Sequence, residues 1–133
     1  GRAKSTRQYW QAVGRRDELR KRLLERWKEA GIDVLLCPGL AVPAFPHGMS
    51  VKLFQACSYT FVWNNFNFPA GVLPVGTVQA GEEAYVERTF RDGFSKVAAE
   101  ACKGSAGLPV SVQVVAPPWR DELCLGAMHI VEQ

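Results

Sequence analysis

The sequence predicts an α/β fold in which helices and short strands alternate along the chain. Of its 133 residues, 47% are apolar and 22% are charged, a composition typical of globular proteins. Three short apolar runs, 32–37, 72–78 and 110–116, have strand character, and segments with helical spacing precede, separate and follow them. Because a sheet of three strands has two open edges, we expect further strands from upstream sequence and interpret residues 1–133 as part of a larger domain.

The first predicted element is a helix over residues 7–30. Leu23 and Trp27 belong to an apolar face at helical spacing, and Gly31 stands where a left-handed residue would end the helix. Residues 1–28 hold ten Lys and Arg against three acidic residues, a net charge of +7, whereas the rest of the chain carries −4. Such a segment suits anionic lipid, an acidic protein surface or nucleic acid, although many basic helix faces simply face solvent.

The next predicted elements are a buried strand and a long loop. Residues 32–37 form an apolar run that Pro38 closes, which is typical of a strand covered on both faces. Residues 38–50 are rich in proline and glycine. We expect them to form a loop that crosses over another element.

A helix and a second strand are predicted in the middle of the chain. Residues 51–66 are apolar and aromatic, and we expect them to form a buried helix. The run 72–78 follows as a strand. Pro74 lies within it, which indicates an edge strand or an irregularity because proline has no N–H to donate to a neighbouring strand.

The last third of the sequence predicts a loop, two helices and the strongest strand. Residues 79–88 are acidic and predict a surface loop, and residues 89–102 have helical spacing of apolar residues. Residues 110–116 are largely β-branched, which favours a strand. Asp121 and Glu122 then occupy the first turn of a final helix, where carboxylates complement the helix dipole.

No catalytic or metal-binding motif is recognisable in the sequence. None of the six serines begins an SxxK motif, and the turn 104–107 lacks the first glycine of a GxSxG elbow. His47 and His129 are isolated in a loop and a helix, and the four cysteines have no zinc-ligand spacing, which favours reduced thiols. We therefore assign no catalytic residue and expect neither a metal ion nor a cofactor.

An aromatic stripe is the unusual feature of the sequence. Core packing is one interpretation of the stripe, and one wall of an apolar ligand pocket is the other, because such pockets are lined by aromatic side chains with few polar groups. The stripe comprises Phe54, Tyr59, Phe61, Trp63, Phe66 and Phe68.

Four segments carry a resemblance to a known family. The segment from Ser58-Tyr59-Thr60 through Asn64 to 68–75 resembles the asparagine-then-Pro-Ala-Gly stretch of amidase-signature enzymes, and 107–116 resembles their Gly-Leu-Pro-Val strand. Residues 118–125 and 32–38 are similar to the fatty acid amide hydrolases of that family in particular. The resemblance covers nearly the whole chain, more loosely over residues 1–20 and 40–52.

The resemblance implies a fold, a reaction and a substrate site. The family folds as a mixed sheet covered by helices and hydrolyses amides with a Ser–Ser–Lys triad, for which this chain has no counterpart. The chain would then be the C-terminal portion of an amidase domain, with the catalytic part upstream. Position by position, Phe54, Cys57 and Phe61 fall on sites that line the acyl channel. A channel tryptophan of those enzymes falls near Lys96 or Val97, where this sequence departs from the pattern.

The resemblance also implies partners and a location. It suggests a lipid amide substrate, an endoplasmic reticulum-type membrane surface on the reducing side of the cell, and a homodimer. The main alternative is a non-catalytic lipid-binding or interaction module derived from an amidase. Nucleic-acid binding through the basic helix is a weaker alternative, because a basic stripe without a recognised fold motif is poor support, and we do not assign nucleic acid as a partner.

Overall fold

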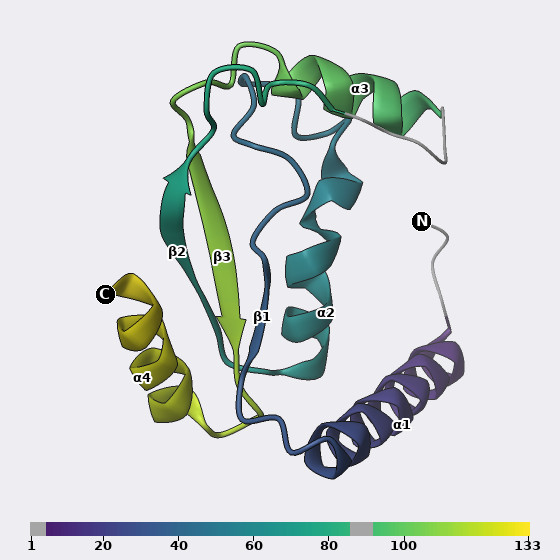
Figure 1. Ribbon diagram of the computed structural model, residues 1–133. Coiled ribbons are helices and arrows are strands. Elements are labelled where there is room, and N and C mark those ends of the chain that lie inside the picture. The colour runs from purple at the N-terminus through teal and green to yellow at the C-terminus, as the bar shows by residue number, and fades with distance from the viewer. Residues whose placement is uncertain (1–4, 86–91) are drawn as a thin grey trace.

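The computed structural model describes residues 5–85 and 92–133, in which helices and strands alternate (Figure 1). This alternation confirms the predicted α/β fold class. In chain order the elements are α1 (Thr6–Glu29), β1 (Leu35–Pro38), the 3₁₀ helix η1 (Phe54–Cys57), α2 (Ser58–Phe66), β2 (Ala70–Thr77), α3 (Gly93–Cys102), β3 (Pro109–Val115) and α4 (Asp121–Glu132).

Strand β3 occupies the centre of a three-stranded sheet of order β1-β3-β2. Both neighbours are antiparallel to β3, so β1 and β2 run in the same direction without being paired. The register between β2 and β3 shifts between Pro74 and Gly76, and β2 lies at an edge of this sheet. Both features confirm the prediction for Pro74, because a strand edge and a bulge are the places where a sheet tolerates a missing N–H.

Different helices cover the two faces of the sheet. Adjacent residues of a strand point to opposite faces. Val114 packs with Cys124 of α4, whereas Val115 packs with Trp63 of α2 and Trp27 of α1. In Figure 1, α4 and α2 accordingly lie on opposite sides of the strands. A third apolar cluster lies where α3 meets the turn before η1, around Leu53 and Ala98.

Helix α1 matches its prediction closely, but only its C-terminal end is packed. Ser5 and Gln8 form a capping box at the start of the helix. At its end Gly31 has a φ of 64°, and the N–H of Ile32 bonds the carbonyl of Trp27, which is the Schellman arrangement. Trp27 is the buried residue of α1. The N-terminal turns extend away from the sheet (Figure 1).

The prediction of a buried helix over residues 51–66 is wrong in two respects. The segment is divided into η1 and α2, and one of its faces is open to solvent. Phe54 is 61% exposed and Phe61 is 39% exposed, whereas Trp63 on the opposite face is buried. The aromatic stripe is therefore partly core and partly surface, because apolar content alone does not say which side chains find a neighbour.

Helix α3 begins at Gly93, after an Asp92 cap whose side chain accepts from the N–H of Ser95. That backbone N–H is the main cause that lowers the pKa of Asp92. The helix was predicted over 89–102, and its expected residues 89–91 lie outside the described residues. Of the predicted acidic loop 79–88, residues 79–85 contain no helix or strand, and 86–88 also lie outside the described residues.

Gly71 of β2 lies directly under the end of the Met128 side chain of α4. A Cβ on Gly71 would overlap the sulfur of Met128. We expect Gly71→Ala to lower the free energy of unfolding by about 1–3 kcal/mol, the usual effect of overpacking. The loss should be smaller in a Met128→Ala background, and urea denaturation of the single and double variants measures it.

Gly76→Ala is the matched control for Gly71→Ala, because nothing lies within 4 Å of a Cβ at Gly76 of the same strand. Its effect should stay within about 0.5 kcal/mol. Equal losses for both glycine variants would contradict a steric role for Gly71.

Candidate substrate-binding site

Phe54, Cys57 and Phe61 lie together on the exposed face of η1 and α2, and we call this face the aromatic surface. The ring centroids of Phe54 and Phe61 are 4.9 Å apart, and the ring planes are inclined by 47°. Cys57, between them in sequence, is half-buried. The structure thus brings together the three residues that the resemblance assigns to the acyl channel, and it leaves both phenyl rings accessible.

Neighbouring residues of the same segment point inward and hold the surface in place. Leu53 and Ala56 are buried in the cluster under α3. Trp63 packs edge-to-face against Trp27, with ring centroids 6.3 Å apart. At the junction of the two helices, the hydroxyl of Thr60 donates to the carbonyl of Cys57 at 2.8 Å. The aromatic surface is therefore the outer side of a segment whose inner side belongs to the core.

A polar anchor from the sheet was missed by the sequence analysis. Gln113 is only 3% exposed, and its Nε2 donates to the carbonyl of Tyr59 at 2.9 Å and to the sulfur of Cys37 at 3.2 Å. A buried amide is costly unless it is hydrogen-bonded. A single glutamine within the apolar run 110–116 was the available signal, although its partner, 54 residues away, could not be inferred from the sequence.

An open depression adjoins the aromatic surface. It is lined by Ser58, Phe61, Val62, Asn64 and Asn65 of α2. The serine hydroxyl and the two amides place hydrogen-bonding groups along one side of Phe61. The surface thus combines an apolar centre with polar groups at one margin, which is the usual character of a site for an amphipathic ligand.

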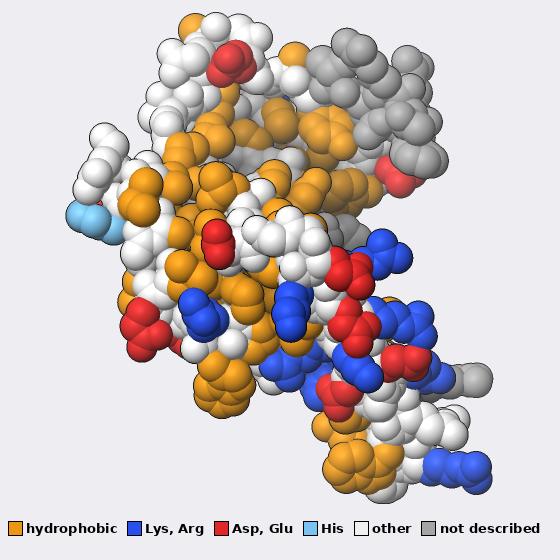
Figure 2. All heavy atoms as spheres, turned by 60° about the horizontal axis from the view of Figure 1, so that its bottom comes forward, with side chains coloured by type: hydrophobic (Ala, Val, Ile, Leu, Met, Phe, Trp, Pro, Cys, Tyr) orange, Lys and Arg blue, Asp and Glu red, His pale blue; other side chains and the backbone are white. Residues whose placement is uncertain are grey.

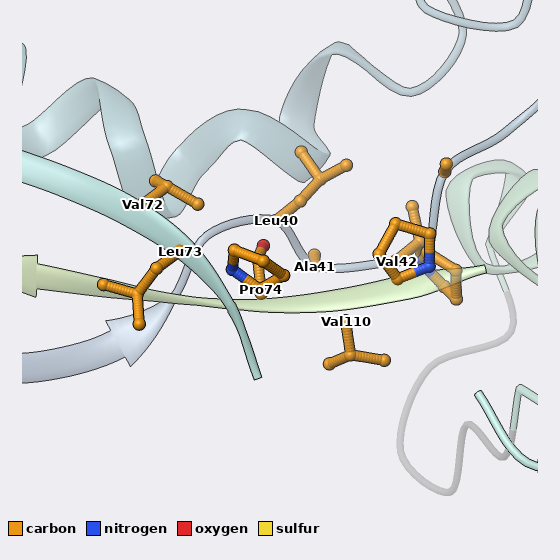
Figure 3. A pocket seen from close by; sticks show the side chains of 11 residues that line it. Leu40, Ala41, Val42, Val72, Leu73, Pro74 and Val110 are labelled. Atoms are coloured by element: carbon orange, nitrogen blue, oxygen red, sulfur yellow. The ribbon is translucent and has the colours of Figure 1, made fainter. Parts of the chain in front are cut away.

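A second concave site lies between the loop segment 40–44 and strands β2 and β3 (Figure 3). Its cavity volume is about 460 Å³, within the range of small-molecule pockets. Most of the lining is apolar, and Ser111 contributes a hydroxyl. Gly39 allows this segment to lie on the sheet, because a Cβ there would meet Ser111 and Val72. The segment therefore crosses over the sheet as predicted, but the sequence did not reveal the groove.

All six serines lie within the described residues, and three of them have hydroxyls in caps or turns. Ser5 caps α1. The hydroxyl of Ser95 donates to Oδ1 of Asp92, the N-cap residue of α3, at 3.1 Å. The buried hydroxyl of Ser105 donates to the carbonyl of Cys102 at 2.7 Å. These three hydroxyls therefore belong to local caps and turns.

The buried thiols are also poor nucleophiles. Burial raises the pKa of the Cys102 thiol. Burial also raises the pKa of Cys124, and the nearby Asp121 carboxylate adds to that rise. Since the thiolate is the reactive form, both groups stay protonated and unreactive near neutral pH. All four cysteines are free thiols, and the described residues contain no group of three or more His, Cys, Asp or Glu side chains that could hold a metal ion.

The charge of the molecule is concentrated on α1. Figure 2 shows basic side chains interspersed with acidic ones along this helix, beside a broad face of hydrophobic side chains. Arg16 pairs with Asp17 at 2.7 Å, Lys21 with Glu25 at 3.9 Å, and Arg22 with Glu18. These pairs leave an excess of positive charge on the helix. No helix within residues 5–85 and 92–133 is both long enough and apolar enough to span a bilayer.

Comparison with known proteins identifies the family. The family model Amidase matches residues 1–125. The chain belongs to the amidase family. Its relatives include "Fatty-acid amide hydrolase 1" of Sus scrofa, which is 41% identical over 135 residues, covering 99% of this chain and 23% of that protein. "Fatty acid amide hydrolase 1" of Caenorhabditis elegans is 36% identical over 103 residues, covering 76% of this chain and 18% of that protein.

A fungal relative and a solved structure agree with this family. "Amidase" of Gibberella moniliformis is 33% identical over 105 residues, covering 79% of this chain and 17% of that protein. A solved "Fatty acid amide hydrolase" matches with a TM-score of 0.83 at 21% identity, over 98% of this chain and 23% of that chain, which shows a shared fold. The chain therefore spans less than a quarter of the length of these relatives.

The isolated 133-residue chain should have no amidase activity, because its sequence contains neither an SxxK motif nor a Gly/Ser-rich signature segment. Incubation with a long-chain acyl amide, and separately with a fluorophosphonate probe, measures turnover and serine labelling. A known serine hydrolase in the same assay serves as the positive control. Labelling of any serine in the chain would show that this part of the molecule carries a nucleophile of its own.

Proposed function

We propose that this chain is the C-terminal portion of a serine amidase that hydrolyses fatty acid amides to a free fatty acid and an amine. In this proposal the chain contributes core strands and one wall of the acyl channel, and upstream sequence contributes the Ser–Ser–Lys triad. Family membership and the names of two relatives support the reaction class. The single observation that carries the substrate assignment is the exposed Phe54–Phe61 pair.

An acyl chain complements the aromatic surface in physical terms. Removing the apolar surface of a phenyl ring from water contributes about 25 cal/mol for each Å² that is covered. An alkyl chain laid on the two rings covers that area, and it offers no hydrogen-bonding group that the rings would leave unpaired. The half-buried Cys57 extends the same apolar wall as a small hydrophobe.

The hydrolytic step itself would use residues outside this chain. A serine nucleophile would attack the amide carbonyl, the amine would leave, and water would then release the fatty acid from the acyl-enzyme. The role of the present residues is to bind and orient the acyl chain, so that the carbonyl reaches the nucleophile in a reactive geometry.

A non-catalytic lipid-binding module is the second candidate. It is favoured by the groove beside segment 40–44, which is formed entirely by residues of this chain. The sequence of the same transcript upstream of Gly1 discriminates the two proposals. A lysine followed by a Gly-Ser-Ser-Gly-Gly-like segment would support the amidase, and an open reading frame lacking both would support the module.

The proposed enzyme acts at an intracellular membrane of the endoplasmic reticulum type, on its reducing side, and functions as a homodimer. The net positive charge of α1 supports contact with anionic head groups. The four free thiols are compatible with a reducing compartment. The substrate, a lipid amide, would reach the acyl channel from that membrane surface.

In the amidase that contains this chain, Phe61→Ala should change the preference for acyl-chain length. Loss of the ring removes apolar contact from the channel wall, and we expect kcat/KM for a long acyl amide to change by a factor that corresponds to about 1–3 kcal/mol. The value for a short acyl amide should stay nearly constant. Because Phe61 is 39% exposed, its loss should destabilise the fold by less than the about 3–5 kcal/mol typical of a buried phenylalanine.

Phe66→Ala is the matched control, since Phe66 is on the same helix but packs against the Trp27–Trp63 cluster. This variant should lower Tm without altering the ratio of long-chain to short-chain kcat/KM. The pocket assignment would be refuted by a Phe61→Ala enzyme that loses activity equally on both amides in proportion to its folded fraction.

The basic helix should bind anionic vesicles in a salt-dependent manner. We expect Arg15→Glu to weaken binding to phosphatidylserine-containing vesicles, because a Lys or Arg near an anionic surface contributes about 1 kcal/mol. Lys103→Glu makes the same charge change at the C-cap of α3, which lies at the opposite end of the molecule from α1 (Figure 1), and should have little effect. Co-sedimentation measures both. Equal binding to neutral and anionic vesicles would exclude the electrostatic contribution.

A further inference from the structure

Gln113 is placed to act on the aromatic surface from beneath. It lies in the central strand β3, opposite Cys37 of β1 and Val72 of β2. Its side chain points to the face of the sheet that α2 covers, where its Nε2 reaches the carbonyl of Tyr59. At 3% exposure the amide is removed from water, so this hydrogen bond has no solvent competitor.

The carbonyl that accepts this hydrogen bond belongs to Tyr59, midway between Cys57 and Phe61 in the sequence. Tyr59 lies in the first turn of α2, the part of the helix that presents the aromatic surface. The bond therefore fixes the distance of this turn from β3 and the rotation of the turn about the helix axis. At the other end of α2, Trp63 and Phe66 are held by apolar packing. Apolar packing resists separation but is not directional, whereas a hydrogen bond weakens steeply when its geometry changes.

Because η1 and α2 are short, the hydrogen bond from Gln113 matters for their position. Helix α2 has nine residues and η1 has four. Helices this short are marginal by themselves, so tertiary contacts set their position. The contact of Gln113 with Cys37 adds a second, weaker acceptor from β1, so one amide joins β1, β3 and α2 at one point.

We infer that Gln113 is a positioning residue for acyl-chain selectivity, acting through the Tyr59 carbonyl on the placement of Cys57 and Phe61. This inference rests on the proposed function of the aromatic surface and deepens it. Gln113 itself contacts no substrate in this arrangement. When the donor is lost, α2 keeps its apolar contacts but its first turn is free to shift, and the channel wall no longer fits a long chain.

The test uses Gln113→Met in the complete amidase, because methionine has nearly the same length and volume but no N–H donor. Rates are expressed per active site titrated with a fluorophosphonate, which removes the effect of partial folding. We expect the ratio of long-chain to short-chain kcat/KM to fall about tenfold. The loss should appear as a raised KM for the long amide, with kcat for the short amide unchanged. Gln113→Asn, whose amide is one methylene too short to reach Tyr59, should give the same result.

Val112→Ala is the matched control on the same strand. Its side chain packs with the cluster under α4, on the opposite face of the sheet. This variant should lower Tm and leave the ratio unchanged. If Phe61→Ala alters the ratio and Gln113→Met does not, the positioning role is overturned and the proposed function stands. If neither variant alters the ratio, the aromatic surface is not an acyl wall and both ideas fall.

Discussion

The burial of β3 on both faces is the constraint on which most of this structure depends. Val114 and Val115 are fully buried, and they point to opposite sides. α1 and α2 pack on the Val115 side, and α4 packs on the Val114 side. Since α4 reaches this core through a close approach to Gly71, the absence of a side chain there is part of the same arrangement. Helices α1, α2 and α4 keep their relative positions because each packs against the same central strand.

The aromatic surface spans two of the three apolar clusters. Phe54 follows Leu53, which belongs to the cluster under α3, whereas Phe61 lies two residues before Trp63 of the cluster against β3. The contact between the two phenyl rings therefore links parts of the molecule whose cores are separate. A shift of α2 relative to β3 would alter this ring contact, since Phe61 moves with α2.

Sequence periodicity was sufficient for the order of the elements but not for their exposure. Helix α1, Gly31 and the irregularity at Pro74 follow from local rules of spacing and backbone geometry, and each was predicted. The exposure of Phe54 and Phe61 depends on which elements come to cover them, and these are distant in sequence. The same reason explains why the Gln113–Tyr59 bond and the groove at segment 40–44 were missed. The resemblance to a family selected the three residues of the aromatic surface, which composition alone could not distinguish from core.

The exposed apolar side chains of this molecule lie on two kinds of element, edge strands and helices, and each kind suits a different binding partner. Leu36, Val72 and Val75 are each about half exposed, but they lie on β1 and β2. Edge strands present unpaired N–H and C=O groups beside their side chains, so the natural complement is another strand that supplies backbone hydrogen bonds. The aromatic surface lies instead on helical segments, whose interior backbone groups are paired within the helix. Only side chains face outward there, and a ligand without donors or acceptors, such as an alkyl chain, can cover them without leaving a polar group unpaired.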